Sequence, residues 1–167
     1  MKNKLSIIIP LFNEEEAIPY LYNRLIKVAE KIDNYDLEFL FVNDGSKDNS
    51  LNLIKEYKKS DDRITYLSLS RNYGKEIAMK AAIDYVNSDV VVIMDADLQH
   101  PPELILEMLK FYHLGYDDVY GKRKGREKES FSLSKDNDEE VFDFDNIKIN
   151  FSAESKIYKP FDINGDG

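Results

Sequence analysis

The sequence predicts an α/β fold built on an open, mainly parallel β-sheet. Short apolar runs, many of them β-branched, recur through the first 121 residues, as is typical of strands buried on both faces of such a sheet. Helical patterns with apolar residues at i, i+3 and i+4 separate these runs. The 167 residues, 43% hydrophobic and 33% charged, suit one soluble domain with a substantial core. Strands that alternate with helices imply right-handed βαβ units.

Five strands and four helices are expected along the chain. The strands are placed at Leu5 to Ile9, Leu37 to Val42, Ile64 to Leu69, Val90 to Met94 and Asp118 to Tyr120. The helices are placed at residues 18–32, 48–59 and 77–85, with a fourth that opens at Pro101 and Pro102. Two prolines followed by Glu103 favour a helix start, because proline fits the first turn and the helix dipole favours an acidic residue there.

Composition excludes several classes of protein. The net charge of −9 argues against nucleic acid as the main partner, because phosphate binding needs a concentrated basic surface. With no cysteine, the chain has no disulfide framework and no thiolate chemistry. The run Leu5 to Phe12 contains Pro10 and is followed closely by three glutamates, so it is interpreted as a strand and not as a signal peptide. No stretch approaches the roughly 18 apolar residues of a membrane helix. We therefore expect a cytoplasmic chain.

The character of the chain changes beyond about Arg126. Residues 131–167 contain nine acidic residues and four lysines, and no long helical period returns. We expect a main domain over residues 1–130 and an irregular acidic C-terminal tail over 131–167, which forms an edge hairpin or is partly disordered. The stretch from Asp162 to Gly167 matches the first half of a calcium loop but lacks the later ligands, so a turn-rich terminus is expected.

Ligands of an open parallel sheet bind beyond the carboxyl ends of its strands. The loops at these ends are all rich in polar and charged residues: 10–16, 43–50, 70–76 and 95–103. In the last loop, Asp95 and Asp97 would point to one face, because side chains alternate along a strand. Two such carboxylates suit Mg²⁺ or Mn²⁺ that carries the phosphates of a ligand. The alternative is that they close a turn or cap a helix.

The sequence contains no known phosphate-binding loop. It lacks both the GxGxxG and the GxxxxGK[ST] patterns, so a metal ion would have to take that role. Asp44 follows the second strand and could accept hydrogen bonds from a nucleobase or ribose, or it could be a turn carboxylate before Gly45. Asn13 and Glu14 lie in the first loop, where Asn13 could also cap a helix.

Five segments, in this order and spacing, resemble one family. They are "IIIPLFNEEE", "FVNDGSKDNS", "LSRNYGKE", "MDADLQHPPE" and "GKRKGRE", and together they cover about residues 4 to 130. The chain resembles the inverting family 2 glycosyltransferases, and within them the polyprenyl-phosphate sugar transferases of the dolichyl-phosphate mannose synthase and bactoprenol glucosyltransferase type. This resemblance implies a Rossmann-like GT-A nucleotide-sugar-binding domain over residues 1–130. It also suggests that the chain is truncated after the donor-binding half.

The resemblance implies which residues bind the donor. Asp44 would contact the base, Arg71 and Lys75 would face phosphates, and Asp95 and Asp97 would hold the metal ion. The complete substrate-binding set comprises Pro10, Asn13, Glu14, Asp44, Arg71, Lys75, Asp95 and Gln99.

The basic motif is the expected catalytic element. By resemblance, Arg123 and Arg126 would face phosphates and neutralise charge on the departing nucleoside diphosphate. The alternative is that Lys122 to Lys128 form a solvated basic run. The family commonly has an acidic residue where His100 stands, and a solvated loop histidine is expected there.

The implied reaction is transfer of a sugar, with inversion, from a UDP- or GDP-sugar to a polyprenyl phosphate. Mg²⁺ or Mn²⁺ would be required, and the protein would lie in the cytoplasm, peripherally at the inner face of the membrane. A non-catalytic nucleotide-sugar-binding remnant and an aspartyl phosphatase are the competing interpretations. No nucleic acid is expected as a partner, and a homo-oligomer is compatible with the sequence.

Overall fold

The structure is a computed structural model that describes residues 2–99, 101–124, 128–143 and 152–153. The chain divides into two compact units, Met1–Ile105 and Leu106–Gly167. The division into residues 1–130 and 131–167 stays a prediction.

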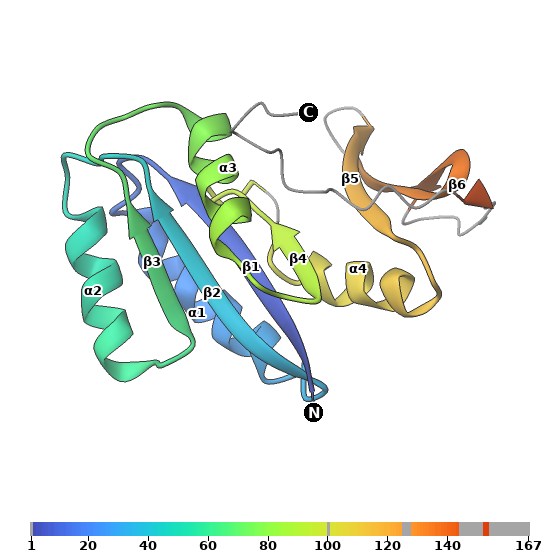
Figure 1. The fold of residues 1–167 in the computed structure, drawn as a ribbon, viewed down its shortest axis with the longest axis horizontal. Coiled ribbons are helices and arrows are strands. Elements are labelled where there is room, and N and C mark those ends of the chain that lie inside the picture. The colour runs from blue at the N-terminus through green and yellow to red at the C-terminus, as the bar shows by residue number, and fades with distance from the viewer. Residues whose placement is uncertain (1, 100, 125–127, 144–151, 154–167) are drawn as a thin grey trace, which may run out of the picture. The chain divides into compact units, whose positions relative to one another are not determined.

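The first unit contains a four-stranded sheet in which every neighbouring pair of strands is parallel (Figure 1). Its strands lie in the order β3 (Ile64–Ser68), β2 (Tyr35–Asn43), β1 (Asn3–Leu11) and β4 (Val90–Ile93). β1 and β2 end together, with Leu11 opposite Asn43, and β4 ends opposite Ile8. The predicted parallel sheet is confirmed, and the carboxyl ends of its strands lie along one edge.

Three helices connect these strands: α1 (Ala17–Ala29), α2 (Ser50–Ser60) and α3 (Lys75–Tyr85). A fourth helix, α4 (Leu104–His113), follows β4 and begins later than predicted. The Leu104 N–H donates to the Pro101 carbonyl oxygen at 3.0 Å in a tight turn, so the two prolines precede the helix. Glu103 therefore lies before the first helical turn, where its carboxylate accepts a hydrogen bond from Arg24 Nε at 3.2 Å.

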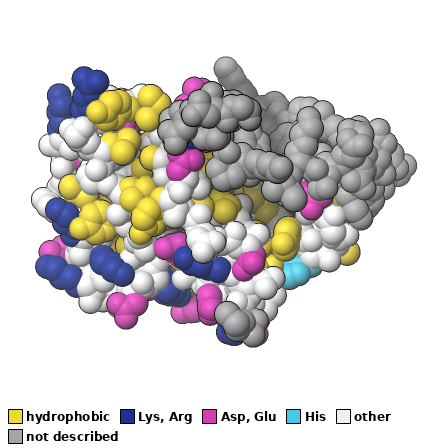
Figure 2. Space-filling model, in the orientation of Figure 1, with side chains coloured by type: hydrophobic (Ala, Val, Ile, Leu, Met, Phe, Trp, Pro, Cys, Tyr) yellow, Lys and Arg dark blue, Asp and Glu magenta, His cyan; other side chains and the backbone are white. Residues whose placement is uncertain are grey.

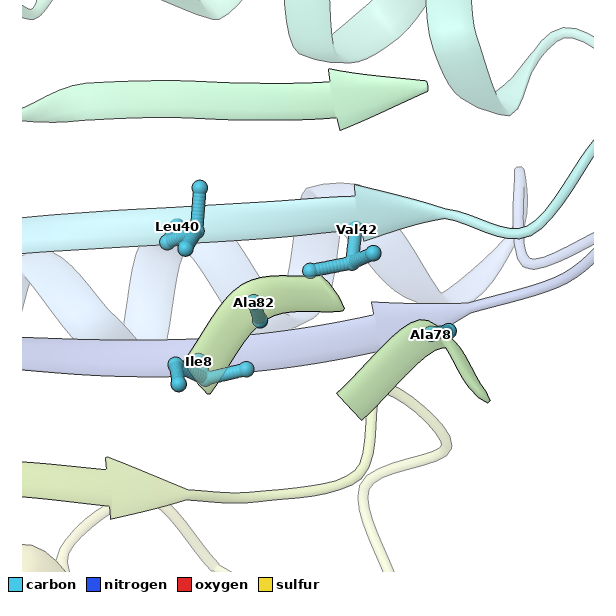
Figure 3. Close-up of a cluster of buried hydrophobic side chains, with 5 residues drawn as sticks. All are labelled: Ile8, Leu40, Val42, Ala78 and Ala82. Carbon is cyan, nitrogen blue, oxygen red and sulfur yellow. The ribbon is translucent and has the colours of Figure 1, made fainter. Parts of the chain in front are cut away.

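The middle of the sheet is buried on both faces, which explains why Ile7 to Ile9 of β1 and Phe39 to Val42 of β2 are apolar without alternation. On one face, Ile8, Leu40 and Val42 form a cluster with Ala78 and Ala82 of α3 (Figure 3). The small alanine side chains allow this helix to lie close to the sheet. The opposite face carries the alternate side chains of the strands, and α1 covers it (Figure 1) with its buried residues, Ile18, Leu21, Leu25, Val28 and Ala29.

The edge strand β4 is only half-buried. Val90 and Val92 are buried, whereas Val91 and Ile93 are exposed.

Figure 2 shows one face of the molecule, on which hydrophobic side chains gather among acidic and basic ones. None of the helices in the described part of the chain combines the length and the apolar character needed to cross a lipid bilayer.

The second unit contains an antiparallel hairpin of β5 (Asp118–Lys124) and β6 (Lys128–Asp143), to which β7 (Ser152–Ala153) adds by pairing with β6. The predicted strand at 118–120 is thus longer than expected and includes Arg123. Regular strand structure also continues through residues 131–143, for which the sequence left a hairpin and partial disorder open. The half calcium loop, His100 and Arg126 lie outside the described residues.

Candidate functional site at the carboxyl edge of the sheet

A cleft of about 260 Å³ lies at the carboxyl edge of the parallel sheet. The loops after β1, β2 and β4 and the start of α3 all contribute to its walls. Six of the predicted site residues meet there: Pro10, Glu14, Asp44, Lys75, Asp95 and Asp97. A second, more open depression of about 560 Å³ is lined by Asn13, Glu14 and Asp48 among others. Glu14 lines both.

The first loop is tied to the second by hydrogen bonds. Asn13 adopts a left-handed conformation (φ 55°), in which its Oδ1 accepts a hydrogen bond from the Lys47 N–H at 2.8 Å. Its own N–H donates to Ser46 Oγ at 2.9 Å, and the Glu14 N–H donates to Ser50 Oγ at 2.9 Å. The Asn13 side chain therefore joins two loops, and it does not cap α1, which has no side-chain cap.

Asp44 ties the second loop to the third. Its side chain is buried, with 3% of the residue exposed. Oδ1 accepts a hydrogen bond from the Tyr73 N–H at 2.8 Å, and Oδ2 accepts one from the Gly74 N–H at 2.9 Å. Gly45 (φ 68°) lies so close to the third loop that a Cβ atom there would be 2.3 Å from the carbonyl carbon of Arg71. We call this arrangement of Asp44 and Gly45 against residues 71–74 the loop latch.

The two aspartates after β4 are more accessible. The Asp95 side chain is 32% exposed, and its Oδ1 forms an ion pair with Lys75 Nζ. Asp97 is exposed, and its Oδ1 accepts a hydrogen bond from the Gln99 N–H at 3.0 Å. Leu98, between Asp97 and Gln99, has a left-handed backbone conformation (φ 61°), which is uncommon for a residue with a side chain. Asp97 thus does close a turn, and it also lines the cleft.

Negative charge is concentrated around this cleft. Burial raises the pKa of Glu14 above its ordinary value, and the nearby carboxylates of Asp97, Asp48 and Asp95 raise it further. Burial alone would also raise the pKa of Asp48, but hydrogen bonds from Ser50 and from the Glu15 backbone outweigh this effect and lower it. Lys75 is the one basic side chain among the described residues that line the cleft. A cation would therefore find a favourable potential here.

The carboxylate oxygens of the cleft suit a hard divalent cation that takes its remaining ligands from outside the protein. Within the described residues, no group of three or more His, Cys, Asp or Glu side chains is arranged to enclose a metal ion. Asp95 and Asp97 offer carboxylate oxygens, which Mg²⁺ and Mn²⁺ prefer. Mg²⁺ is commonly held by one or two carboxylates together with substrate phosphates and water. The cleft could therefore bind such an ion weakly by itself and more tightly together with a phosphorylated ligand.

The remaining predicted residues are not assembled at the cleft by any described contact. Arg71 is exposed, and its guanidinium carbon lies 4.8 Å from the centroid of the Tyr73 ring. Gln99 is also exposed. The backbone of Arg123 lies in β5, opposite Glu129 of β6. The roles of these residues and of Arg126 stay predictions.

The sequence does not reveal the partners of two key carboxylates. It predicts that Asp44 contacts a base or closes a turn, whereas in the structure both of its oxygens accept hydrogen bonds from the third loop. A glycine after an aspartate signals a turn, but it does not say which distant backbone passes close to it. The ion pair of Lys75 with Asp95 joins residues 20 positions apart, and it follows only from the way α3 starts beside the end of β4.

Comparisons with known proteins agree with this architecture. The family model described as glycosyl transferase family 2 matches residues 6–162. The chain is 46% identical over 127 residues to the uncharacterized glycosyltransferase YkcC of Bacillus subtilis strain 168. This alignment covers 75% of this chain and 39% of the relative. It is 41% identical over 123 residues to the bactoprenol glucosyl transferase of Shigella phage SfX, over 74% of this chain and 40% of the relative. The chain thus spans about two fifths of the length of these relatives.

A solved structure shows the same fold. The mannosyltransferase PcManGT from Pyrobaculum calidifontis, in complex with GDP-Man and Mn²⁺, aligns with a TM-score of 0.61 at 20% sequence identity. The alignment covers 74% of this chain and 36% of that chain. The fold is therefore the Rossmann-like GT-A fold that the resemblance implied. The chain belongs to glycosyl transferase family 2.

Proposed function

We propose that this chain binds the donor for a reaction that transfers a sugar from a UDP- or GDP-sugar to a polyprenyl phosphate. The observation that carries the proposal is the acidic cleft at the carboxyl edge of the sheet, where Asp95 and Asp97 meet Glu14 and Lys75. The name of the phage relative supports a lipid phosphate acceptor. The complex of the archaeal mannosyltransferase supports a nucleotide-sugar donor and a divalent cation.

Each cleft residue has a role in this proposal. Asp95 and Asp97 hold Mg²⁺ or Mn²⁺, which when bound neutralises negative charge on the donor diphosphate. Lys75 lies beside them and reaches the same phosphates. Glu14, together with Pro10 and Asn13, frames the nucleotide. Asp44 faces the base while its carboxylate keeps the third loop in place.

The remaining residues act on the phosphates. Arg71 of the third loop and Gln99 beside Asp97 contact the donor diphosphate. Arg123 and Arg126 neutralise the charge that develops on the departing nucleoside diphosphate, because arginine can clamp a phosphate through two parallel hydrogen bonds.

The acceptor needs little activation. The second pKa of a phosphate monoester is about 6, so an acceptor oxygen is largely ionised at neutral pH. This oxygen attacks the anomeric carbon from the side opposite the leaving group, which inverts the configuration there. An acceptor of this kind is a membrane lipid, so the protein would work peripherally at the membrane surface.

Calorimetry with a panel of UDP- and GDP-sugars, each with and without Mn²⁺, tests the donor half of this proposal. We expect one base to bind and the binding to require the metal ion. Equal affinity without Mn²⁺, or no binding of any nucleotide sugar, would contradict it.

A transfer assay tests the acceptor half. Incubation with the bound donor, Mn²⁺ and a polyprenyl phosphate should give a polyprenyl-phosphate sugar that mass spectrometry detects. Donor binding without this product would favour the non-catalytic nucleotide-sugar binder. The family match already favours the transferase over the aspartyl phosphatase, and failure to trap phosphate on Asp95 would agree with that.

A further inference from the structure

The acidic cleft already contains a cation that belongs to the protein. Lys75 Nζ lies against Asp95 Oδ1, the carboxylate that the proposed function assigns to the metal ion. A metal ion at this carboxylate and the Lys75 ammonium would carry like charges at close range, so the two compete for Asp95. We propose that Lys75 is a counter-ion that competes with free divalent cations for Asp95 and that its side chain pairs with the donor diphosphate when a metal–nucleotide complex is bound. This inference rests on the proposed function, because it takes the metal site from there.

The loop latch fixes the backbone from which Lys75 projects. Lys75 is the first residue of α3, and the two residues before it donate their N–H groups to Asp44. Gly45 brings the second loop into direct contact with the backbone of Arg71 and Asn72. The start of α3 is therefore held in place, and a change of partner requires only the side chain to move.

The Lys75 side chain is free to make such a move. It is 54% exposed, and its flexible four-carbon stem carries a compact charge that can pair with a carboxylate or with a phosphate. An ion pair with this exposure is weak, because water screens it. A divalent ion that brings twice the charge can therefore displace the lysine from Asp95.

The charge around the cleft explains why a counter-ion is needed. Without any cation, the carboxylates of Asp95, Asp97 and Asp48 repel one another and also oppose the ionisation of Glu14. Lys75 offsets part of this repulsion in the absence of ligand. Once a metal ion occupies the aspartates, the nearest new negative charge is the diphosphate, and the lysine gains by pairing with it.

This exchange would make the cleft select for the metal–nucleotide complex. Free Mg²⁺ or Mn²⁺ must displace Lys75 and leaves its charge without a partner. The same ion bound to a nucleoside diphosphate displaces Lys75 but offers it a phosphate. Removal of the lysine charge should therefore raise the affinity for the free ion and lower the affinity for the metal–nucleotide complex.

The test is calorimetry of Lys75→Met on the full chain with two probes, Mn²⁺ alone and Mn²⁺ together with the nucleoside diphosphate that the wild type binds. We expect Mn²⁺ alone to bind Lys75→Met about threefold to fivefold more tightly than the wild type. We expect the Mn²⁺–nucleotide complex to bind about fivefold to tenfold more weakly. A lysine with only a structural role would not move the two affinities in opposite directions.

Two control variants separate local from general effects. Lys80→Met removes the same charge from the same helix, where Lys80 pairs with Asp84, so it should leave both affinities within about twofold of the wild type. Lys75→Arg keeps a cation at the cleft and should keep the wild-type affinity for Mn²⁺ alone. Thermal unfolding followed by circular dichroism checks that all variants are folded.

Each outcome decides the inference. Opposite changes in Lys75→Met, absent from Lys80→Met, support it. The counter-ion role is wrong if Mn²⁺ alone binds Lys75→Met no better than the wild type. It is also wrong if Mn²⁺ alone binds neither protein. If the nucleotide complex binds the variant as well as the wild type, the move to the diphosphate is wrong. Failure of the wild type to bind any Mn²⁺–nucleotide complex would instead contradict the proposed function, and the Mn²⁺ titrations would still decide the counter-ion role.

Discussion

Two carboxyl groups at the same edge of the sheet have opposite surroundings. Asp44, after β2, is buried and accepts a hydrogen bond on each oxygen from a fixed backbone N–H group. Asp95, after β4, is 32% exposed and is paired with a flexible lysine. Backbone donors cannot leave without unfolding the loop, whereas a lysine side chain can. The partner of a carboxylate thus distinguishes one that is fixed in place from one whose partner can change.

The same contrast extends to the turns around these residues. After β2, the backbone of the third loop passes so close to Gly45 that there is no room for a side chain. After β4, the Gln99 N–H donates to Asp97 Oδ1 across a turn in which Asp97 and Gln99 are both exposed. We therefore expect substitutions after β2 to reduce stability and substitutions after β4 to reduce binding.

The largest effect is expected at Gly45. Gly45→Ala should lower the free energy of unfolding by about 4 kcal/mol, because its Cβ would collide with backbone and its φ is positive. Gly74→Ala is the matched control, since Gly74 also has a positive φ (96°) but nothing within 4 Å of its Cβ position. It should lose only about 2 kcal/mol from backbone strain. Urea unfolding measures both, and equal losses would show that the close approach at Gly45 is unimportant.

Asp97→Asn should have the largest effect on binding. The neutral side chain offers a much weaker ligand to a divalent ion, so the affinity for the nucleotide sugar in the presence of Mn²⁺ should fall about a hundredfold, or about 2.7 kcal/mol. Its free energy of unfolding should stay within about 0.5 kcal/mol of the wild type, because the residue is exposed. Calorimetry and urea unfolding of the same preparation check both values. Unchanged affinity would remove Asp97 from the metal site.

Asp44→Asn, unlike Asp97→Asn, should lower the free energy of unfolding. One of the two backbone N–H groups would face an amide NH₂ in place of an oxygen, and a buried donor without an acceptor costs about 2 kcal/mol. Urea unfolding should therefore detect a loss that Asp97→Asn does not show. If Asp44→Asn were as stable as the wild type, the loop latch would not depend on the carboxylate.

The smallest effect concerns a structural carboxylate away from the cleft. Hydrogen bonds from Arg63 hold the pKa of Asp61 below its ordinary value of 3.8, although burial opposes them. The ionised form thus stabilises the fold above pH 3.8, and this contribution is lost as the pH falls through the lowered pKa of the folded state. Urea unfolding between pH 5 and pH 2.5, a range chosen to span about a unit on either side of 3.8, should show a shallower acid dependence for Asp61→Asn.

Its exposed neighbour supplies the control for this titration. Asp62→Asn should retain the acid dependence of the wild type, because Asp62 is exposed whereas Asp61 is buried beside Arg63. If Asp61→Asn and the wild type lose stability in parallel, other carboxylates dominate acid unfolding.

Much of the fold follows from the sequence because its strands are short, apolar and separated by helical patterns. Ile7 to Ile9 and Phe39 to Val42 lack polar residues, and burial on both faces of a parallel sheet explains this. The four loops at the carboxyl edge could also be located, since parallel strands all end at one side. The start of α4 could not, because Pro101 and Pro102 fit a turn before a helix as well as its first positions.

Less of the site could be predicted. The sequence identifies Asp44, Asp95 and Asp97 as candidates, but their local patterns are similar, and each could be a turn residue or a ligand. Their difference depends on burial and on partners that lie 20 to 30 positions away. Such contacts depend on how the loops meet, which short motifs do not encode.

A crystal structure of the chain with Mn²⁺ and its nucleotide sugar tests the central claim most directly, because the anomalous signal of manganese locates the ion. We predict an anomalous peak within bonding distance of a carboxylate oxygen of Asp95 or Asp97 and of the diphosphate. The Lys75 side chain should then be turned away from Asp95. A bound nucleotide whose manganese lies away from both aspartates, with Lys75 still paired to Asp95, would contradict this account.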